Sequence, residues 1–268
     1  MVSDKDIFQG MTALVTGGSS GIGLEFTIQL AHLGINILIV SNQEQSLKDT
    51  ATDIANRYNV KTYYLYKDLS EENAAISISD FCEENNIKID ILINNAGIFT
   101  FKELTKLSLS QLNTYINLHI RCVTELCHIF GIKMRERQNG YILNMSSMSC
   151  WMPMPGITMY SATKAYIRVL SRSLYLEWKD YNVGVTVACP GGIATDLFGL
   201  PHNLQRLGVN LGILVTPRKF VAKALSSMFR KKPQYINGLF NRLSIFCIAI
   251  LPSRIKLLVK HRLLDKNG

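Results

Sequence analysis

The sequence predicts an α/β protein built on a doubly wound parallel sheet of about seven strands. Short apolar runs rich in β-branched residues alternate with longer amphipathic stretches, which is the pattern of consecutive β-α-β units. The run 35–40 is almost continuously apolar, as expected of a strand whose two faces are both covered by helices. The 268 residues contain no linker, low-complexity tract or long repeat, so we expect a single domain over residues 1–268.

The expected elements alternate in a regular order along the chain. Strands are predicted at 13–16, 35–40, 62–66, 91–94, 141–146 and 184–188. Helices are predicted to start near Gly21, Glu44 and Glu71, and two longer helices to cover 111–137 and 160–179. Residues 195–214 follow the sixth strand as an insertion. We expect this insertion to overhang the carboxyl edge of the sheet, where ligands bind in such folds.

The composition excludes several classes of protein. Hydrophobic residues make up 47% of the chain and charged residues 18%, which is typical of a folded globular protein. The six cysteines include no C-x-x-C pair and the five histidines no paired-ligand spacing, so we expect reduced thiols and no structural metal. Residues 1–10 lack the basic and apolar regions of a secretory signal. Together these features predict a cytoplasmic protein.

The net charge of +9 is concentrated at the C-terminal end. From Arg218 onward, twelve basic residues stand against the single acid Asp265, which gives this segment a charge of +11 and the preceding chain −2. Because the chain before this segment is close to neutral, we expect no nucleic-acid partner.

The C-terminal tail, residues 239–268, combines an apolar run with basic residues. The unbroken apolar run 243–251 is far shorter than the roughly 20 residues that cross a bilayer. Two interpretations remain open. The run either packs on the sheet edge or on a partner subunit, or it makes peripheral membrane contact beside basic residues that attract anionic head groups.

A glycine-rich segment, TGGSSGIG at 16–23, joins the first predicted strand to the first predicted helix. Glycines allow a tight turn and close approach of the backbone, and the N–H groups at a helix N-terminus attract a pyrophosphate. An ordinary β-α turn is the alternative for any isolated glycine pattern. The strand before it and the helix after it favour a dinucleotide cofactor.

The motif T-G-x-x-x-G-x-G at 16–23 is followed by NNAG at 94–97 and by Y-x-x-x-K at 160–164. With these motifs in this order, the chain resembles the short-chain dehydrogenase/reductase family in its short single-domain branch, from about Thr12 to about Thr195. The resemblance implies a Rossmann-like NAD(P)-binding catalytic domain. It also implies a homodimer or homotetramer formed through the two long helices.

Tyr160 and Lys164 lie one helical turn apart and therefore share a face. A phenol with a pKa near ~10 exchanges protons poorly at neutral pH, and a neighbouring cation lowers that pKa. Such a pair alone is usually a surface contact, but Ser147 lies thirteen residues upstream at the end of a predicted strand. The resemblance implies that Ser147, rather than Ser146, polarises a carbonyl that Tyr160 protonates.

Asn117 matches the asparagine that the family carries on its long central helix. The resemblance implies that Asn117 holds a water molecule in a proton relay behind Lys164. The alternative is a neutral surface or interface residue, which is the usual role of an asparagine in mid-helix.

The remaining matches to the family concern the cofactor. Asp68 corresponds to an aspartate that contacts adenine, although it is also a suitable helix N-cap before Ser70. The segment 190–195 resembles one that closes over the nicotinamide. The complete predicted cofactor-binding set is Gly17, Ser19, Ser20, Gly21, Ile22, Gly23, Asn42, Asp68, Leu69, Asn94, Ala96, Gly97, Tyr160, Lys164, Pro190, Gly191, Ile193 and Thr195.

The end of the second predicted strand bears on the choice between NAD and NADP. An NAD enzyme usually carries an acid there that binds the ribose 2′-hydroxyl, but this chain reads Val40-Ser41-Asn42. No arginine stands there and no basic residue lies in the glycine loop, while Glu44 is nearby. These residues slightly favour NADP(H) over NAD(H).

These features predict an oxidoreductase that interconverts a ketone and a secondary alcohol by hydride exchange with NAD(P)(H). We expect the apolar segments 151–155 and 197–214 to flank the substrate pocket, which favours a hydrophobic small molecule of steroid-like, lipid or long-chain acyl type. The alternative is an NAD(P)-binding sensor or scaffold without turnover.

Overall fold

The protein's architecture is seen in a computed structural model that describes residues 8–194, 201–210 and 214–238, with single positions between 241 and 257. Its described strands form one parallel sheet in the order β3-β2-β1-β4-β5-β6-β7. The strands are β1 (Thr12–Thr16), β2 (Asn36–Ser41), β3 (Thr62–Tyr66), β4 (Ile91–Asn94), β5 (Gly140–Met145), β6 (Val183–Ala188) and β7 (Gln234–Tyr235). The order reverses between β1 and β4, so these two strands mark the switch point of the sheet.

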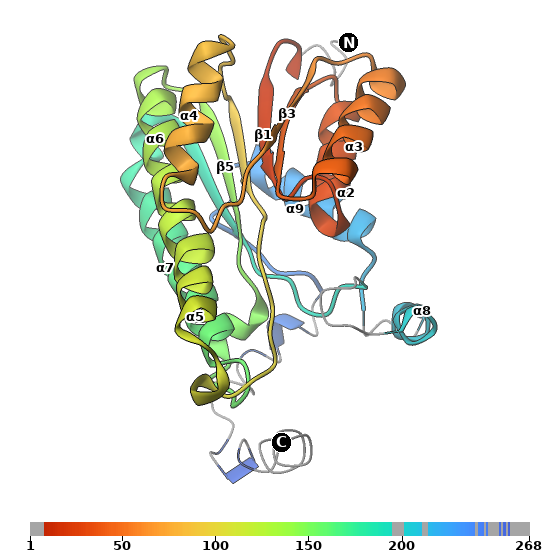
Figure 1. The fold of residues 1–268 in the computed structure, drawn as a ribbon, viewed down its shortest axis with the longest axis vertical. Coiled ribbons are helices and arrows are strands. Elements are labelled where there is room, and N and C mark those ends of the chain that lie inside the picture. Colours follow the sequence, from red (N-terminus) through yellow and green to blue (C-terminus); the bar gives the residue numbers. More distant parts are fainter. Residues whose placement is uncertain are drawn as a thin grey trace.

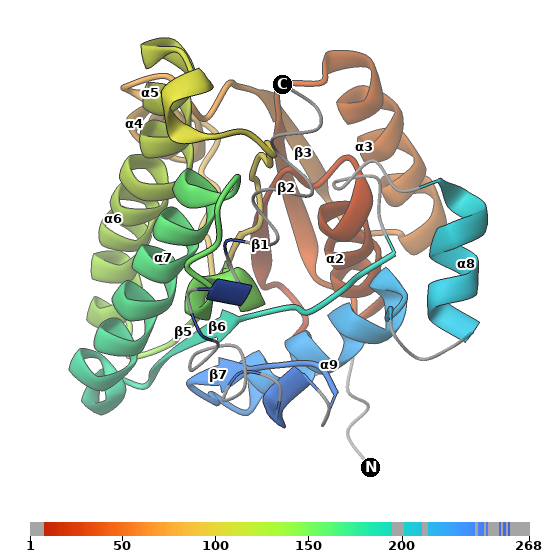
Figure 2. The ribbon, with the colours of Figure 1, turned by 90° about the horizontal axis from the view of Figure 1, so that it is seen from below.

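Helices cover both faces of this sheet. The α-helices are α2 (Gly21–His32), α3 (Glu44–Tyr58), α4 (Ala74–Glu84), α5 (Leu109–Ile116), α6 (Cys122–Glu136), α7 (Thr158–Glu177), α8 (His202–Asn210) and α9 (Pro217–Phe229). In Figure 1, α4, α5, α6 and α7 lie on one side of the strands and α2, α3 and α9 on the other. Figure 2 shows the same three layers after a quarter turn.

Two apolar cores fill the space between the layers. On β1, Leu14 belongs to the core beneath α4, α6 and α7, whereas its neighbour Val15 belongs to the core beneath α2, α3 and α9. Both side chains are fully buried. Because consecutive strand residues point to opposite faces, burial on both sides requires strands without polar alternation, which explains their continuous apolar runs.

A chain of polar groups crosses this interior. The amide Nδ2 of Asn94 on β4 donates to Oδ1 of Asn144 on β5 at 2.8 Å. Asn144 Nδ2 then donates to Ser171 Oγ on α7 at 2.9 Å. The three side chains are almost completely buried, so the bonds compensate for the loss of water. This polar chain connects two central strands to α7.

The predicted doubly wound α/β fold is confirmed, and the six located strands agree with the structure within one residue at each end. Two helix predictions were wrong in detail. The helix expected from Glu71 begins at Ala74, and the expected helix 111–137 is α5 and α6 joined by the π-helical segment η2 (Asn117–Arg121). The position of β7 was not predicted because it is only two residues long.

The described residues include no helix that is both long enough and apolar enough to cross a bilayer. Most of the C-terminal tail, 239–268, lies outside the described residues, so both interpretations of it stay open. Helix α8 occupies part of the expected insertion 195–214, of which 195–200 and 211–213 are not described.

Candidate active site

A cleft of about 400 Å³ lies at the carboxyl ends of the strands, on both sides of the switch point between β1 and β4. Its lining includes the following members of the predicted cofactor set: Gly17, Ser20, Gly21, Ile22, Asn42, Asp68, Leu69, Ala96, Gly97, Tyr160, Lys164 and Pro190. Residues from six separate segments therefore meet at one sheet edge.

The glycine loop turns sharply at the floor of this cleft. Gly17 and Gly21 have φ of +63° and +53°, a region that favours glycine. A Cβ on Gly23 would lie 2.0 Å from the carbonyl oxygen of Gly17, so the start of α2 packs directly on the loop. Ser20, the N-cap of α2, makes no side-chain cap hydrogen bond. The first-turn N–H groups are thus suited to bind an anion such as a pyrophosphate.

Replacing Gly23 by Ala is expected to raise the Kd for the dinucleotide at least tenfold, because a contact of 2.0 Å forces the loop away from α2. Titration of intrinsic fluorescence with cofactor measures the affinity. Gly10→Ala controls for a general destabilisation by glycine replacement, since the positive φ of Gly10 strains an alanine there, but nothing lies within 4 Å of its would-be Cβ and Gly10 does not line the cleft. Equal cofactor affinity in Gly23→Ala and the wild type would contradict the assignment of the loop.

The end of β2 is connected to the glycine loop by hydroxyl groups. Ser19 Oγ donates to Ser41 Oγ at 2.9 Å, and the backbone N–H of Gln43 donates to the same oxygen at 3.2 Å. Ser19 itself is buried, whereas Ser41 and Asn42 line the cleft. This part of the cleft presents hydroxyl and amide groups and no carboxylate of β2.

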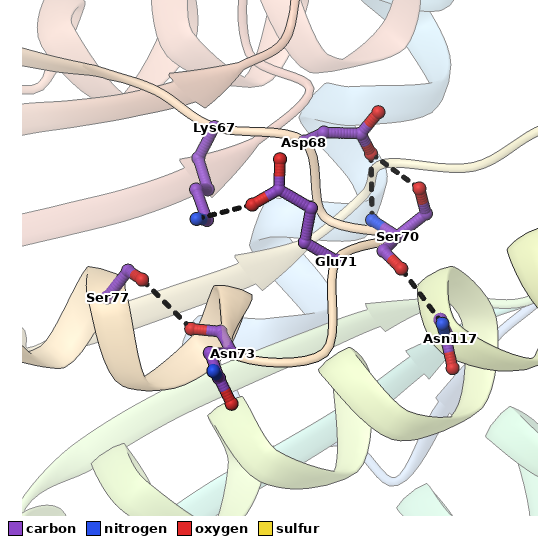
Figure 3. A network of polar contacts seen from close by, with 7 residues as sticks. All are labelled: Lys67, Asp68, Ser70, Glu71, Asn73, Ser77 and Asn117. Atoms are coloured by element: carbon purple, nitrogen blue, oxygen red, sulfur yellow. Dashed lines mark hydrogen bonds and ion pairs between the residues drawn. The ribbon is translucent and has the colours of Figure 1, made fainter.

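Asp68 lies at the end of β3 in a turn of polar contacts (Figure 3). Its Oδ1 accepts bonds from the backbone N and from Oγ of Ser70, both at 2.8 Å. Partial burial raises the pKa of Asp68, but the bonds from Ser70 and from Asn42 outweigh it and leave the pKa below its ordinary value. Asp68 is therefore a charged acceptor at the cleft, and its contact with adenine stays a prediction. The alternative role as helix N-cap was wrong, because α4 begins at Ala74 with Asn73 as its N-cap, and Asp68 instead holds the turn before that helix.

Asn94 and its neighbour Asn95 have different surroundings. Asn94 points into the sheet interior and bonds Asn144, and it is not among the cleft-lining residues. Asn95, which the sequence reasoning did not select, lines the cleft and donates through Nδ2 to the carbonyl of Thr16 at 3.1 Å. The sequence signal that could have identified Asn95 was its place in the NNAG motif. Asn95 fixes the glycine loop relative to the end of β4.

Tyr160 lies in the first turn of α7, with a side chain that is 94% buried against the wall of the cleft. Burial raises its pKa to about 12, although a hydrogen bond with the Ser147 side chain lowers the pKa in part. The ring of Phe99 packs edge-on against Tyr160, with centroids 5.1 Å apart. Ser146 also lines the cleft, but its hydroxyl donates to the Lys164 carbonyl at 2.7 Å. Of the two serines, Ser147 contacts the phenol.

Lys164 is buried one turn further along α7. Its Nζ donates to the carbonyl of Met145 at the end of β5, at 2.9 Å, and lies 5.7 Å from the centroid of the Tyr160 ring. Burial lowers its pKa to about 8. From the sequence, Lys164 was expected to lower the pKa of the phenol. In the structure, burial has the largest effect on the pKa of both side chains, and it raises the pKa of Tyr160.

The side chain of Asn117 bonds to the segment that follows β3. Its Nδ2 donates to the backbone carbonyl of Ser70 at 2.9 Å, beside the turn that holds Asp68 (Figure 3). The residue two positions later, His119, is buried and contacts the ring of Tyr160 instead. Residues two positions apart in a helical segment point in roughly opposite directions, so the two side chains have different neighbours. The Asn117 side chain is thus bonded to Ser70, and its part in a proton relay stays a prediction.

The segment after β6 borders the far end of the cleft. The Pro190 carbonyl accepts a bond from the N–H of Met148 at 2.9 Å, and the N–H of Gly191 donates to Asn237 Oδ1 at 2.7 Å. Ile193 pairs with Val215 in an isolated parallel bridge. Gly191 and Ile193 support this segment without lining the cleft, and the predicted contact Thr195 lies outside the described residues.

The expected pocket wall 151–155 lies elsewhere. These residues line a second hollow of about 600 Å³ together with Ser161 and Ala165 of α7, and this hollow shares no lining residue with the cleft. Tyr160 and Lys164 leave α7 on a different face from Ser161 and Ala165. The expectation that 151–155 borders the same pocket as Tyr160 is therefore not supported by this geometry.

The doubly wound sheet, the glycine loop and the cleft at the switch point define a nucleotide-binding α/β protein of the Rossmann type. The residues present fit a dinucleotide, because the loop approaches α2 too closely for any side chain at Gly23 and leaves the helix N-terminus open to an anion.

The sequence profile described as short chain dehydrogenase matches residues 11–201, and the chain belongs to this family. It is 31% identical to the human protein named inactive hydroxysteroid dehydrogenase-like protein 1, over 82% of this chain and 66% of that protein. It is 32% identical to the very-long-chain 3-oxoacyl-CoA reductase of Rattus norvegicus, over 70% of this chain and 61% of that protein. The chain thus spans less than two thirds of the length of either relative.

A solved structure of a short-chain dehydrogenase from Sphingobium yanoikuyae in complex with NADPH is similar throughout. The TM-score is 0.77 at 25% identity, and the match covers 95% of this chain and 97% of that one. The similarity extends over the sheet and its covering helices.

Proposed function

We propose that this protein is an NAD(P)(H)-dependent oxidoreductase that interconverts a ketone and a secondary alcohol on a hydrophobic substrate. The observation that carries the proposal is that Tyr160 and Lys164 line the same cleft as the glycine loop, while Ser147, which is not itself a lining residue, hydrogen-bonds Tyr160. An acid, a carbonyl-polarising hydroxyl and a cation at a dinucleotide site are the groups that ketone reduction requires.

The chain's own groups act on the reacting oxygen. In the reduction direction Ser147 and Tyr160 hydrogen-bond the carbonyl oxygen, and the phenol then donates its proton to the forming alkoxide. Because burial raises the pKa of Tyr160 to about 12, the phenol remains protonated through the neutral range. Lys164, held on the Met145 carbonyl, places positive charge beside the phenol and would hold the ribose of a bound cofactor. The bound reduced nicotinamide supplies the hydride.

NADP(H) is the proposed cofactor. The end of β2 offers the Ser41 hydroxyl and the Asn42 amide, so no carboxylate of this strand repels a 2′-phosphate. The similar Sphingobium structure was solved with NADPH, which is consistent with this choice. Glu44 on α3 forms an ion pair with Lys48 at 2.6 Å, and this pairing moderates its repulsion.

A lipophilic carbonyl is the proposed substrate class, of steroid-like, lipid or long-chain acyl type. The support comes from the relatives, one of which is named for the reduction of very-long-chain 3-oxoacyl-CoA.

We also place the protein in the cytoplasm as a homodimer or homotetramer, with peripheral membrane contact through its basic tail as the open alternative. Val169 and Leu176 on α7 are 58% and 68% exposed, as expected of a helix that packs on a partner subunit.

The test is a substrate panel assayed with NADPH and with NADH. Long-chain 3-oxoacyl thioesters and ketosteroids are expected to give turnover, and small ketoses to give little, with the higher kcat/KM for NADPH. Absorbance at 340 nm follows the reaction. Preference for the small ketoses, or for NADH, would overturn the corresponding part of the proposal.

The second candidate is a cofactor-binding protein without turnover. It is favoured by one observation, the name of the human relative, which describes that protein as inactive. The two candidates separate in the same assay, because a sensor or scaffold binds NADP(H) tightly and gives no turnover on any carbonyl of the panel. The presence of Tyr160, Ser147 and Lys164 together favours the enzyme.

A further inference from the structure

His119 is a fully buried histidine that the proposed chemistry does not use. It lies in the π-helical segment η2, between the loop that follows β4 and the first turns of α7. π-Helical turns occur frequently at functional sites because they reorient a side chain within a helix. The position of this histidine beside Tyr160 and Lys164 therefore points to a role at the active site.

Both ring nitrogens of His119 have partners. Nε2 accepts a hydrogen bond from the backbone N–H of Ile98 at 3.1 Å, so it carries no proton. Nδ1 lies 2.9 Å from Thr163 Oγ1. The Thr163 hydroxyl has carbonyls of α7 within reach, those of Met159 at 2.9 Å and of Tyr160 at 3.1 Å, to which it donates its own hydrogen. Nδ1–H is consequently the donor to Thr163, and the bonds select a single neutral tautomer.

The imidazole also lies close to Gly97. A Cβ on Gly97 would lie 3.0 Å from His119 Nε2 and 3.5 Å from Lys164 Nζ, so the two side chains converge on the same glycine. The His119 ring stands at 68° to the ring of Tyr160, with centroids 6.2 Å apart. Gly97 and Ile98 both line the cleft. His119 therefore packs between the loop 97–98 and α7, two elements that both line the cleft.

The electrostatic surroundings favour the neutral ring. Burial, with a smaller effect from the charge of Lys164, lowers the pKa of His119 well below its ordinary value. Protonation of Nε2 would also break the bond from Ile98, since a protonated nitrogen cannot accept. With both nitrogens bonded in this way, the ring has no free site with which to carry a proton.

We propose that His119 is a positioning residue, whose neutral imidazole braces the loop 97–98 against Thr163 and so holds Tyr160 and Lys164 in reactive geometry. The role rests on the proposed function. It predicts that two hydrogen bonds, rather than ring size, are needed at this position. Removal of those bonds would misplace the phenol relative to the carbonyl, which affects kcat more than binding.

The test compares His119→Phe with His119→Gln. Phe keeps a planar ring but removes the acceptor of the Ile98 N–H and the donor to Thr163 Oγ1, whereas the amide of Gln supplies one acceptor and one donor. We expect His119→Phe to lower kcat about 10- to 100-fold with a cofactor Kd within threefold of the wild type, and His119→Gln to recover most of the rate. The kcat is referred to the number of cofactor-binding sites, so that loss of folded protein does not imitate the effect.

Thr124→Val is the matched control. Thr124 Oγ1 contacts the Tyr166 hydroxyl at 2.8 Å and thus joins α6, which directly follows η2, to α7 away from the cleft. Its kcat is expected to equal that of the wild type. A readout that does not depend on turnover is the ¹⁵N spectrum of the imidazole, which should show a protonated Nδ1 and an unprotonated Nε2 in the cofactor-free protein.

The outcomes separate the two proposals. If the wild type turns over substrate and the kcat of His119→Phe lies within twofold of the wild-type kcat, the positioning role alone is overturned. An imidazole protonated on Nε2 would also overturn it. If Thr124→Val lost as much kcat as His119→Phe, the loss would come from helix packing in general. That result would also overturn the positioning role. Absence of wild-type turnover on every carbonyl of the panel would overturn the proposed function and, with it, this role.

Discussion

Replacing Tyr160 by Phe is expected to lower kcat by about 10³-fold or more while the Kd for NADP(H) stays within threefold. The substitution removes one oxygen from a side chain that is 94% buried, so the fold has little reason to change. The lost group is the proposed proton donor and the hydrogen-bond partner of Ser147. Steady-state rates on the preferred ketone, with cofactor binding measured in parallel, check the prediction.

Tyr166→Phe provides the control for this substitution. Tyr166 lies on the same helix, six residues further along, and its hydroxyl contacts Thr124 rather than the cleft. Its kcat should equal that of the wild type. If Tyr160→Phe retained a substantial part of the wild-type rate, the phenol could not be the proton donor, and the mechanism would be wrong.

Lys164→Met is expected to produce an inactive protein that is more stable than the wild type in the absence of cofactor. Burial lowers the pKa of Lys164 from 10.5 to about 8, so folding carries a cost for the ammonium ion at neutral pH. The bond to the Met145 carbonyl offsets part of this cost. We expect a net gain of about 1–3 kcal/mol in the free energy of unfolding at pH 7, measured by urea denaturation.

The sign of the pH dependence follows from the same shift. Below pH 8 the lysine is protonated in the folded and the unfolded chain, and the burial cost is fully present. Between pH 8 and 10.5 the folded protein releases its proton before the unfolded chain does, so the cost disappears as the pH rises. The stability difference between variant and wild type should therefore be largest at pH 7 and small by pH 10.5. A variant less stable than the wild type at pH 7 would contradict the prediction.

The strands and the glycine loop could be predicted because their determinants are local. A strand buried on both faces must be apolar throughout, and a loop that packs against a helix start admits only glycine at Gly23. The pair Tyr160 and Lys164 follows from the helical repeat in the same way. These features require no knowledge of what lies opposite them in the fold.

The direction of a side chain within a long helix could not be predicted with the same certainty. Asn117 and His119 lie in a π-helical segment, where the number of residues per turn differs from that of an α-helix. Sequence alone does not reveal such a turn, so the direction of the Asn117 side chain, toward Ser70, could not be predicted. The pKa of Tyr160 was also misjudged, because spacing indicates which groups are neighbours but not how deeply they are buried.

The polar chain from Asn94 through Asn144 to Ser171 has a consequence for how the protein folds. Apolar strands pair almost equally well when they slip by two residues, since the same face stays inward. A slip between β4 and β5 would leave buried amides without partners, at a cost of about 1–3 kcal/mol for each. The amides thus favour the native register between β4 and β5. Because Ser171 is on α7, the helix that carries Tyr160 docks fully only on a correctly aligned sheet.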